Sequence, residues 1–589
     1  MVSTRWVSWG WMVGLVGVLL VGWGPGSARA ARPAAARLLP EKTILLLSVP
    51  DVRELARRFL NTSLGRIGQD PQMQPLVKNV YGRASEAVER GRQVLGVSLG
   101  DMLAMPQGEF AFAVVPQDDQ PIAVVLLLDT GNEVAKARTL LANVAMAVEG
   151  SGAKKSEETV AGATLKIYEG VPQLRTLALV EKDGTVVVGN SVGVLKGILE
   201  AWNGGKVRSL AQNPKYSEAM SYCRGKKGEE PQAFFYVDPI GFFKASAQGN
   251  AGMQMGLVML PTLGLDGFQA VAASVAMDTD QFDTIFHGHV LLDRPRAGVL
   301  DLIALESGDT TPEPWVPNDV VRYVTLRWKF EKTYKGVAKL VDSFQGEGTF
   351  ARQVGNNIRQ ATGLDLAKEI LPQLDGRLTY LTWIERPVTQ TSRATLVAIG
   401  LKDPVAAGKL FDSVVAKHSQ AMTLATASGK TYYQIGRAIE RPASDAPWQP
   451  RPCVGILEKS LVFTDRPALY EKVLAIATRP EESLGKSLDF KVVASQIARR
   501  ASGAKPGMFS FERPEEAMRF FYELVTSEAS RQPGPGGMRN PVLQAARSAL
   551  ESSPLPPFAV IERYLAPGGS TLTDDEGGLH FSSFSMKRK

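Results

Sequence analysis

The sequence predicts an α+β protein built from two tandem copies of a mainly antiparallel sheet with helices packed on one face. Two observations lead to this prediction. Apolar runs, turns and amphipathic stretches of the first half recur in the same order in the second half. Within each copy, consecutive strands are joined by short polar turns, which favour antiparallel pairing.

Three pairs of segments carry the duplication: residues 40–49 and 317–326, residues 186–190 and 461–465, and residues 231–239 and 506–514. We therefore expect a first repeat at residues 31–306 and a second at 315–589. The polar, proline-containing stretch at 307–314 is the expected linker between them. Because each motif of one repeat has a matching position in the other, the duplication also tests any proposed catalytic residue.

The first repeat opens with a leucine-rich strand at residues 43–49, and Asp51 is the expected N-cap of the helix at 51–60. Apolar residues at helical spacing predict longer helices at 75–95 and 134–148. Further strands are expected at residues 109–115, 122–128, 164–168, 176–181, 185–188, 233–237, 268–277 and 284–292, with helices at 191–202 and 214–222. The second repeat is expected to close on paired strands at 558–565 and 578–586.

Residues 1–30 have the pattern of an export signal. Arg5 precedes the uncharged stretch 6–23, and Ala28-Arg29-Ala30 matches the A-x-A site that signal peptidase recognises. We expect cleavage after Ala30 and an exported protein, periplasmic or secreted. The alternative is a retained membrane anchor, because the uncharged stretch reaches the lower length limit for spanning a bilayer.

The composition argues against a nucleic-acid partner. The chain holds 67 Lys and Arg against 60 Asp and Glu, a net charge of +7. No run of basic residues is interleaved with aromatics, which is the usual footprint of nucleic-acid binding. The only cysteines, Cys223 and Cys453, fit either one disulfide or two separate buried thiols. Hydrophobic cores must therefore hold the fold.

Gly189-Asn190-Ser191-Val192-Gly193 matches the G-x-S-x-G pattern of serine hydrolases, between an expected strand and an expected helix. At the matching position of the second repeat, Ser191 is replaced by Arg466. Asn190 and its counterpart Asp465 are both good N-cap residues. The duplication therefore favours helix capping over catalysis at this position.

Asp129-Thr130-Gly131 matches the D-T-G of aspartic proteases, which need two aspartates that share a proton. The second repeat has no such motif at the matching position. There, Asp403 begins a helix, as Asn132 does in the first repeat. We therefore expect Asn132 and Asp403 to be N-caps and assign no catalytic role to Asp129.

Metal and phosphate sites find little support. His287 and His289 lie on the same face of an expected strand, but no ligand stands at convincing spacing from them, so we expect an ordinary solvent-facing pair. Gly429-Lys430-Thr431 has Leu424 where a phosphate loop needs glycine. The sequence therefore predicts no catalytic, cofactor-binding or metal-binding residue.

The turns and strands resemble those of a known family. Leu39-Pro40-Glu41-Lys42-Thr43 opens a strand that leads to Val49-Pro50-Asp51-Val52, and Thr62-Ser63-Leu64-Gly65 follows the first helix. A later strand begins with Gly108 to Phe112, and Pro556-Pro557-Phe558 precedes the closing strands. Together they resemble the exported bacterial proteins grouped as domain of unknown function 3352, over most of the mature chain. The resemblance implies export and brings no activity, cofactor or catalytic residue with it.

The sequence favours a non-catalytic envelope protein with a binding or structural role, whose partner is an unknown protein or an apolar small molecule. One alternative is a periplasmic carrier of an apolar ligand, with the Met/Gly-rich segment 252–260 lining a cavity. The competing interpretation of that segment is a buried helix. A third alternative is an exported serine hydrolase centred on Ser191.

Overall fold

The contacts between the elements divide the chain into two compact units. A computed structural model describes residues 32–95, 97–118, 122–248, 250–436, 451–501, 505–527 and 553–588, together with residues 544, 548 and 550. The first unit extends to Leu260 and includes Phe268–Asp293, and the second holds Pro261–Gly267 and the chain from Arg294 onwards. The expected signal segment at 1–30, with its cleavage site, lies outside the described residues.

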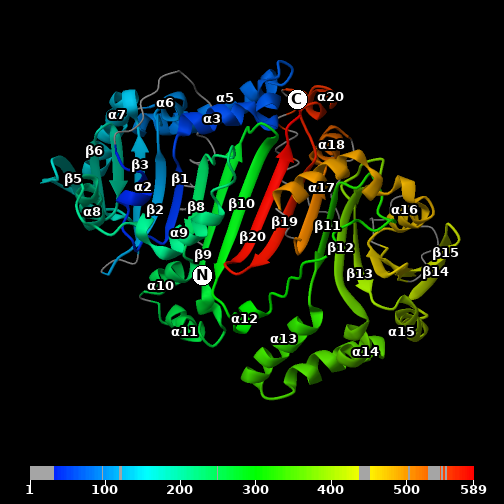
Figure 1. The fold of residues 1–589 in the computed structure, drawn as a ribbon. Coiled ribbons are helices and arrows are strands. Elements are labelled where there is room, and N and C mark those ends of the chain that lie inside the picture. The colour runs from blue at the N-terminus through cyan, green and yellow to red at the C-terminus, as the bar shows by residue number, and fades with distance from the viewer. Residues whose placement is uncertain are drawn as a thin grey trace. The chain divides into compact units, whose positions relative to one another are not determined.

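The sheet of the first unit is antiparallel throughout, and its first strand lies in the middle rather than at an edge (Figure 1). Starting from β4, the order of neighbouring strands is β4 (Lys154–Val160), β5 (Ala163–Val171), β6 (Arg175–Lys182), β7 (Thr185–Gly189), β3 (Ile122–Asp129), β2 (Phe110–Pro116), β1 (Leu45–Val49), β8 (Ala233–Val237), β9 (Phe268–Met277) and β10 (Phe282–Leu292).

The helices of the first unit fill the connections between these strands. They are α2 (Ala35–Leu38), α3 (Val52–Asn61), α4 (Ser63–Gln69), α5 (Gln74–Leu95), α6 (Leu99–Ala104), α7 (Val134–Gly150), α8 (Val192–Trp202), α9 (Pro214–Tyr222), α10 (Pro239–Ala247) and α11 (Ala251–Met259), with short 3-10 turns η1 (Gly131–Glu133) and η2 (Leu210–Gln212).

The main core of the first unit lies between one face of the sheet and the helices α2, α8 and α9. Alternate residues of a strand point to the same face, so β2 and β3 each place every second side chain in this core. Ala111, Ala113 and Ala123 are fully buried there, and their small side chains leave room for the helices. On the opposite face, α7 packs Leu141 and other apolar residues against β5 and β6.

The second unit repeats the same strand order. Starting from β14, it runs β14 (Met422–Ala427), β15 (Lys430–Ile435), β16 (Cys453–Leu457), β17 (Ser460–Thr464), β13 (Arg393–Leu401), β12 (Leu374–Ile384), β11 (Arg322–Arg327), β18 (Met508–Glu512), β19 (Gly568–Asp575) and β20 (Gly578–Met586). Each strand occupies the place of its counterpart in the first unit, so the duplication includes the topology.

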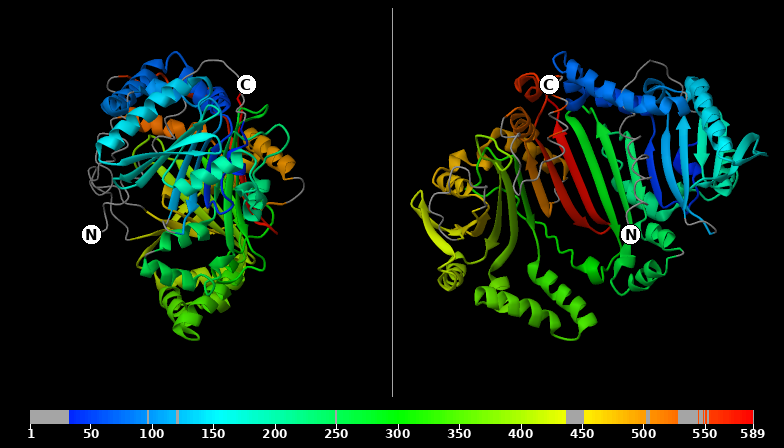
Figure 2. Two further views of the ribbon diagram at one scale, coloured as in Figure 1. Left: turned by 90° about the vertical axis from the view of Figure 1, so that its left-hand side faces the viewer. Right: turned by 180° about the vertical axis from the view of Figure 1, so that it is seen from behind.

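The helices of the second unit differ most between its first two strands. There, α13 (Phe330–Gln345) and α14 (Asn356–Thr362) lie beyond the ends of β12 and β13 (Figure 2). The other elements are η3 (Leu265–Gly267), α12 (Gly298–Asp301), η4 (Ala351–Gly355), η5 (Leu366–Ile370), η6 (Leu371–Gln373), α15 (Pro404–Lys417), α16 (Pro467–Ala477), η7 (Pro480–Glu482), η8 (Leu484–Lys486), α17 (Leu488–Arg500), α18 (Pro514–Thr526) and α20 (Ala559–Glu562).

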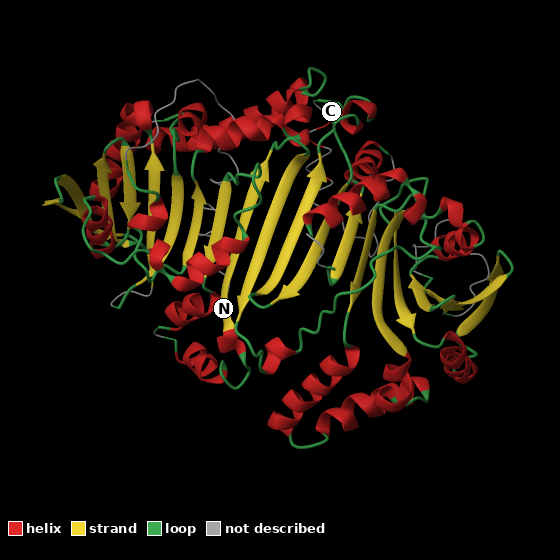
Figure 3. Cartoon of the chain, viewed as in Figure 1, coloured by secondary structure: helices red, strands yellow, loops and turns green. Residues whose placement is uncertain are grey.

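The predicted fold class is confirmed, because each unit is α+β with an antiparallel sheet (Figure 3). The expectation that the helices pack on one face is wrong for the first unit, since α8 and α7 cover opposite faces of its sheet. The helices expected at 75–95 and 134–148 are α5 and α7. The strand expected at 558–565 is wrong, since α20 occupies that stretch and β19 begins only at Gly568. Val560 and Ile561 are both buried, as neighbours on a helical turn can be, and their run is too short to show a period.

The close packing of α8 on β7 gives a test of the fold. A Cβ added at Gly189 would lie 2.7 Å from Leu195 Cδ1 and 2.9 Å from the Val124 carbonyl oxygen, whereas one at Gly197 would meet nothing within 4 Å. We expect Gly189→Ala to lower the free energy of unfolding by about 1–3 kcal/mol. Gly197→Ala, within α8, should raise it by about 0.5–1 kcal/mol. Urea unfolding of both variants measures the difference, and equal midpoints would contradict this packing.

Candidate functional site

Ser191 caps helix α8. Its hydroxyl oxygen accepts a hydrogen bond from the Val194 N–H at 3.4 Å, and its hydroxyl donates to Gln117 Oε1 at 2.9 Å. The side chain is buried. Donor and acceptor functions of the hydroxyl are thus both used within the fold, which is the role of an N-cap serine.

Asn190 and Asp465 are matched in the structure, but the expectation that they are N-caps is wrong. Asn190 Oδ1 accepts from the Val124 N–H at 2.7 Å, and Asp465 Oδ1 accepts from the Thr395 N–H at 2.9 Å. Both residues therefore bind the turn after the strand to the neighbouring strand. The N-cap of α16 is Arg466, which makes no capping bond with its side chain.

Of the two predicted N-caps Asn132 and Asp403, only Asp403 caps its helix. Asp403 accepts from the N–H groups of Val405 and Ala406, so the predicted cap of α15 is confirmed. The predicted cap Asn132 is wrong, because it lies within η1 and the helix α7 begins after Glu133. The intervening 3-10 turn displaces the N-cap by one residue, from Asn132 to Glu133.

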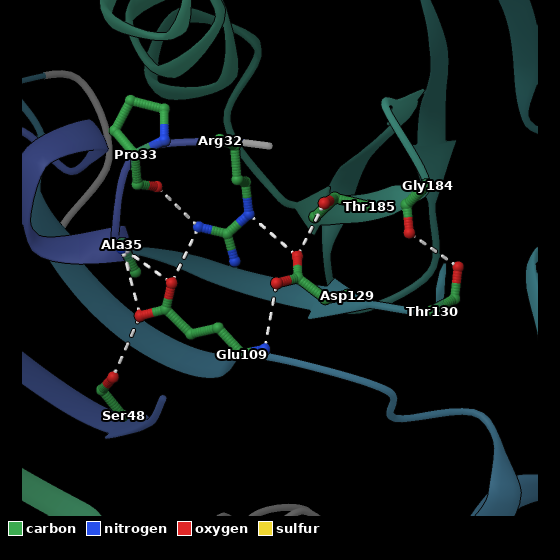
Figure 4. A network of polar contacts seen from close by, with 9 residues as sticks. All are labelled: Arg32, Pro33, Ala35, Ser48, Glu109, Asp129, Thr130, Gly184 and Thr185. Atoms are coloured by element: carbon green, nitrogen blue, oxygen red, sulfur yellow. Dashed lines mark hydrogen bonds and ion pairs between the residues drawn. The ribbon is translucent and has the colours of Figure 1, made fainter. Parts of the chain in front are cut away.

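Asp129 belongs to a buried network of charges (Figure 4). Arg32, just before α2, donates from Nε to Asp129 Oδ1 at 2.9 Å and from Nη1 to Glu109 Oε2 at 2.8 Å. The guanidinium side chain is 1% exposed, and the two carboxylates are 6% and 12% exposed. A cation from the segment before the first strand is thus held between the start of β2 and the end of β3.

The two carboxylates of this network use their remaining oxygen lone pairs within the fold. Glu109 accepts from the Ala35 N–H and from the Ser48 hydroxyl at 3.2 Å. Asp129 Oδ2 accepts from the Glu109 N–H at 2.9 Å. Burial raises the pKa of the Glu109 carboxyl above its ordinary value, and the charge of Arg32 opposes this rise.

The second unit has a matching network with the charges reversed. Ser48 and Thr325 hold matching positions on the first strands of the two units, where they lie opposite Ala111 and Thr379. Glu109 lies two residues before Ala111, and Arg377 lies two residues before Thr379. Glu109 and Arg377 therefore hold matching positions. Arg377 Nε forms an ion pair of 2.9 Å with Glu313, which precedes the first strand of its unit.

The second ion pair also has a supporting carboxylate, but Asp375 comes from β12 itself, whereas Asp129 comes from the neighbouring strand β3. Asp375 Oδ1 accepts from the Arg377 N–H at 2.7 Å, as Asp129 accepts from Glu109. Glu313 further accepts from the Thr379 hydroxyl at 2.6 Å. An ion pair that survives with its polarity exchanged ties two segments together, so we interpret Asp129 and Glu109 as structural residues. The opposite charges at matching positions were the sequence signal for this network.

His287 and His289 lie on one face of β10, but the expectation of a solvent-facing pair is wrong. Their exposed fractions are 8% and 0%. The ring of His289 stacks on Tyr222 with 3.8 Å between ring centroids, and His287 Nε2 lies 3.7 Å from Glu229 Oε2. Within the described residues, no group of three or more His, Cys, Asp or Glu side chains is placed to hold a metal ion.

Cys223 and Cys453 are both free and fully buried, which confirms the interpretation as separate thiols. Cys223 ends α9, and Cys453 begins β16. Burial raises the pKa of each thiol to about 12. Because only the thiolate is a good nucleophile, neither residue is suited to covalent catalysis.

The remaining sequence candidates lie at the surface. Ser428 and Gly429 have positive φ values of 47° and 72° and form the tight turn between β14 and β15, so Gly429-Lys430-Thr431 belongs to a hairpin. The segment 252–260 forms most of α11, whose Met255 and Val258 are 69% and 71% exposed. The expectation of a buried helix is therefore wrong, because these apolar side chains face solvent.

A groove in the second unit is the best candidate for a binding site. It has a volume of about 650 Å³, lies between α13 and the start of β12, and adjoins a second hollow of about 640 Å³. We call it the lysine groove after the five lysines that line it, which are Lys329, Lys332, Lys335, Lys339 and Lys402. Across the two hollows, basic side chains outnumber carboxylates.

Three of the five lysines form ion pairs, and the other two leave a surplus of positive charge in the groove. Lys332 lies 2.7 Å from Asp301, and Lys335 lies 2.6 Å from Glu331, while the pair of Lys329 with Glu306 is longer at 3.7 Å. Within the described part of the chain, neither Lys339 nor Lys402 forms a salt bridge. Lys339 and Lys402 are therefore the lysines of the groove that can bind an acidic group without giving up a salt bridge of the described residues.

Comparison of the chain with protein-family models, with curated proteins and with solved structures finds no match. Among the described residues, no helix combines the length and the apolar character that crossing a bilayer requires.

The ion pair of Arg32 gives a second prediction. Arg32→Met keeps the length of the side chain but leaves Glu109 and Asp129 as uncompensated buried charges. We expect the free energy of unfolding to fall by about 3–5 kcal/mol, as for other buried pairs that lose one partner. Arg37→Met, at an exposed position of α2, should change it by less than about 0.5 kcal/mol. Urea unfolding compares them, and equal losses would exclude a special role for Arg32.

Glu109 should also make the stability of the first unit depend on pH. The pKa of Glu109 in the folded state lies above the ordinary value of 4.5 that it has in the unfolded chain. At a pH between the unfolded pKa and the folded pKa, the folded state therefore binds more protons than the unfolded chain. By linkage, its contribution to the free energy of unfolding rises as pH falls through this window. Glu109→Gln cannot titrate, so wild type should gain stability relative to the variant as pH falls from neutral towards the ordinary carboxyl pKa of 4.5. A pH-independent difference in urea unfolding would contradict the raised pKa.

Proposed function

We propose that the chain is an exported, non-catalytic binding protein of the cell envelope, and that the lysine groove of its second unit holds a partner rich in acidic groups. The observation that carries the proposal is the groove itself, in which Lys332, Lys335 and Lys339 follow one another at helical spacing on α13. Export is supported by the pattern of residues 1–30.

The shape and position of the groove support binding rather than a purely structural role. Helix α13 has no buried residue, so the core of the unit does not require its lysines. The groove has a volume of about 650 Å³, which falls within the range of volumes found for ligand-binding clefts. The groove is lined by five lysines and by four carboxylates, which are Asp301, Glu306, Glu331 and Asp375, and this small surplus of positive charge favours acidic partners.

The alternatives have less support from the geometry. For a serine hydrolase, the hydroxyl of Ser191 would have to leave both of its hydrogen bonds, to Val194 and to Gln117. For an apolar carrier, the Met/Gly-rich segment would have to enclose a ligand, whereas Met255 and Val258 of α11 face solvent. In the lysine groove, Lys339 and Lys402 form no salt bridge within the described residues and can receive an acidic ligand directly.

Charge reversal tests the groove. A fluorescein-labelled oligoglutamate peptide should bind the full chain, and fluorescence anisotropy should show that added salt weakens the binding. Lys335→Glu with Lys339→Glu should raise its dissociation constant roughly tenfold or more, because each exposed charge contact is worth about 0.2–1 kcal/mol and reversal adds repulsion.

A matched variant controls for net charge. Lys486→Glu with Lys491→Glu changes the charge by the same amount at exposed positions near and on α17 of the same unit. Its affinity for the peptide should stay within about twofold of wild type. If the wild-type chain fails to bind, or if both double variants lose affinity equally, the lysine groove is not the site.

A further inference from the structure

The two units differ sharply at one edge of their sheets. Within the described residues, β4 pairs with β5 alone, and its counterpart β14 pairs with β15 alone. The hairpin turns match, since Ala161-Gly162 and Ser428-Gly429 both have positive φ. The two edges therefore have the same backbone design and can be compared residue by residue.

The edge of the first unit is charged, and that of the second is not. Counting back from the matched turns, Lys155 corresponds to Met422 and Glu157 to Leu424. Lys155 and Glu157 form an ion pair of 3.1 Å on β4. The strand β14, with the sequence MTLATA, carries no charge at all. Charged side chains on an edge strand oppose pairing with another strand, so only the first unit has this protection.

The free backbone groups of β14 follow from the register of its hairpin. Ala427 and Lys430 close the two-residue turn, so alternate residues from Ala427 backwards exchange hydrogen bonds with β15. The Gly436 N–H donates to the Ala421 oxygen at 2.8 Å, which continues this alternation. The N–H and C=O groups of Met422, Leu424 and Thr426 therefore point away from the hairpin.

Apolar side chains lie next to these backbone groups. Met422 is opposite Ile435, and Leu424 is opposite Tyr433, so all four share one face of the hairpin. Leu424 is 58% exposed and Ile435 is 39% exposed. A strand added at this edge would cover apolar surface as well as satisfy the backbone groups, which is the arrangement that strand addition uses.

We propose that β14 is a self-association edge, at which two copies of this chain pair β14 with β14 in antiparallel orientation about a two-fold axis. An uncharged strand can face itself without placing like charges opposite each other. Head-to-tail pairing of β14 with β4 would instead desolvate Lys155 and Glu157. Because both copies use the same edge in a two-fold contact, association through β14 stops at a closed dimer.

Equilibrium sedimentation of the mature chain tests this proposal. One strand pair is a small interface, so we expect a dissociation constant in the micromolar range. Met422→Lys with Leu424→Glu places the charges of β4 on β14, and should raise this constant at least tenfold. The exposure of Leu424 makes loss of folding unexpected, and circular dichroism checks it. A wild-type chain that stays monomeric up to about 200 µM would overturn the proposal.

The reciprocal variant gives a gain of association. Lys155→Met with Glu157→Leu removes the charges of β4 and opens a second edge, so the weight-average mass should rise beyond that of a dimer as concentration increases. Leu488→Glu adds a charge at a 76% exposed position of α17 and should leave the dimer unchanged. If Leu488→Glu dissociates the dimer as strongly as the β14 variant, the interface lies elsewhere and the proposal is wrong.

Discussion

Each unit depends on one ion pair, largely shielded from solvent, that ties the segment before its first strand to its second strand. A buried charge without a partner is strongly unfavourable, so the position of each partner constrains the other. In the first unit the cation is Arg32 and the carboxylate is Glu109; in the second the carboxylate is Glu313 and the cation is Arg377. The exchange of polarity shows that the link between the two segments is what the fold requires.

The sequence could predict the helices and strands whose apolar residues recur at regular spacing and face a core. The apolar stripe of α7 and the alternating strands of the central sheet place side chains in the cores, so their patterns are strong. Strand β4 was missed because Lys154–Val160 is polar and lies at an edge with no residue buried. The strand expected at 558–565 failed for the related reason that a short apolar run does not distinguish a helical turn from a strand.

The candidate site was harder to predict than the fold. Ser191 and Asp129 stand out as motifs, yet one caps a helix and the other receives Arg32 from far along the chain. Lysines at the spacing of Lys332, Lys335 and Lys339 are typical of an ordinary solvated helix face. Only the placement of α13 beside the start of β12 turns that face into one wall of a groove, and this placement is a tertiary contact with no local signal.

The same scaffold carries different surfaces in its two copies because only its core is constrained. In the first unit, α3 buries Val52 and Ala56, and Arg58 of this helix donates to the Met277 carbonyl oxygen. In the second unit, α13 follows the matching strand but buries no residue. A helix released from the core leaves a concave surface beside the sheet, and its side chains can change without loss of stability. The second unit is therefore where a binding function can have arisen while the ion pairs kept the fold.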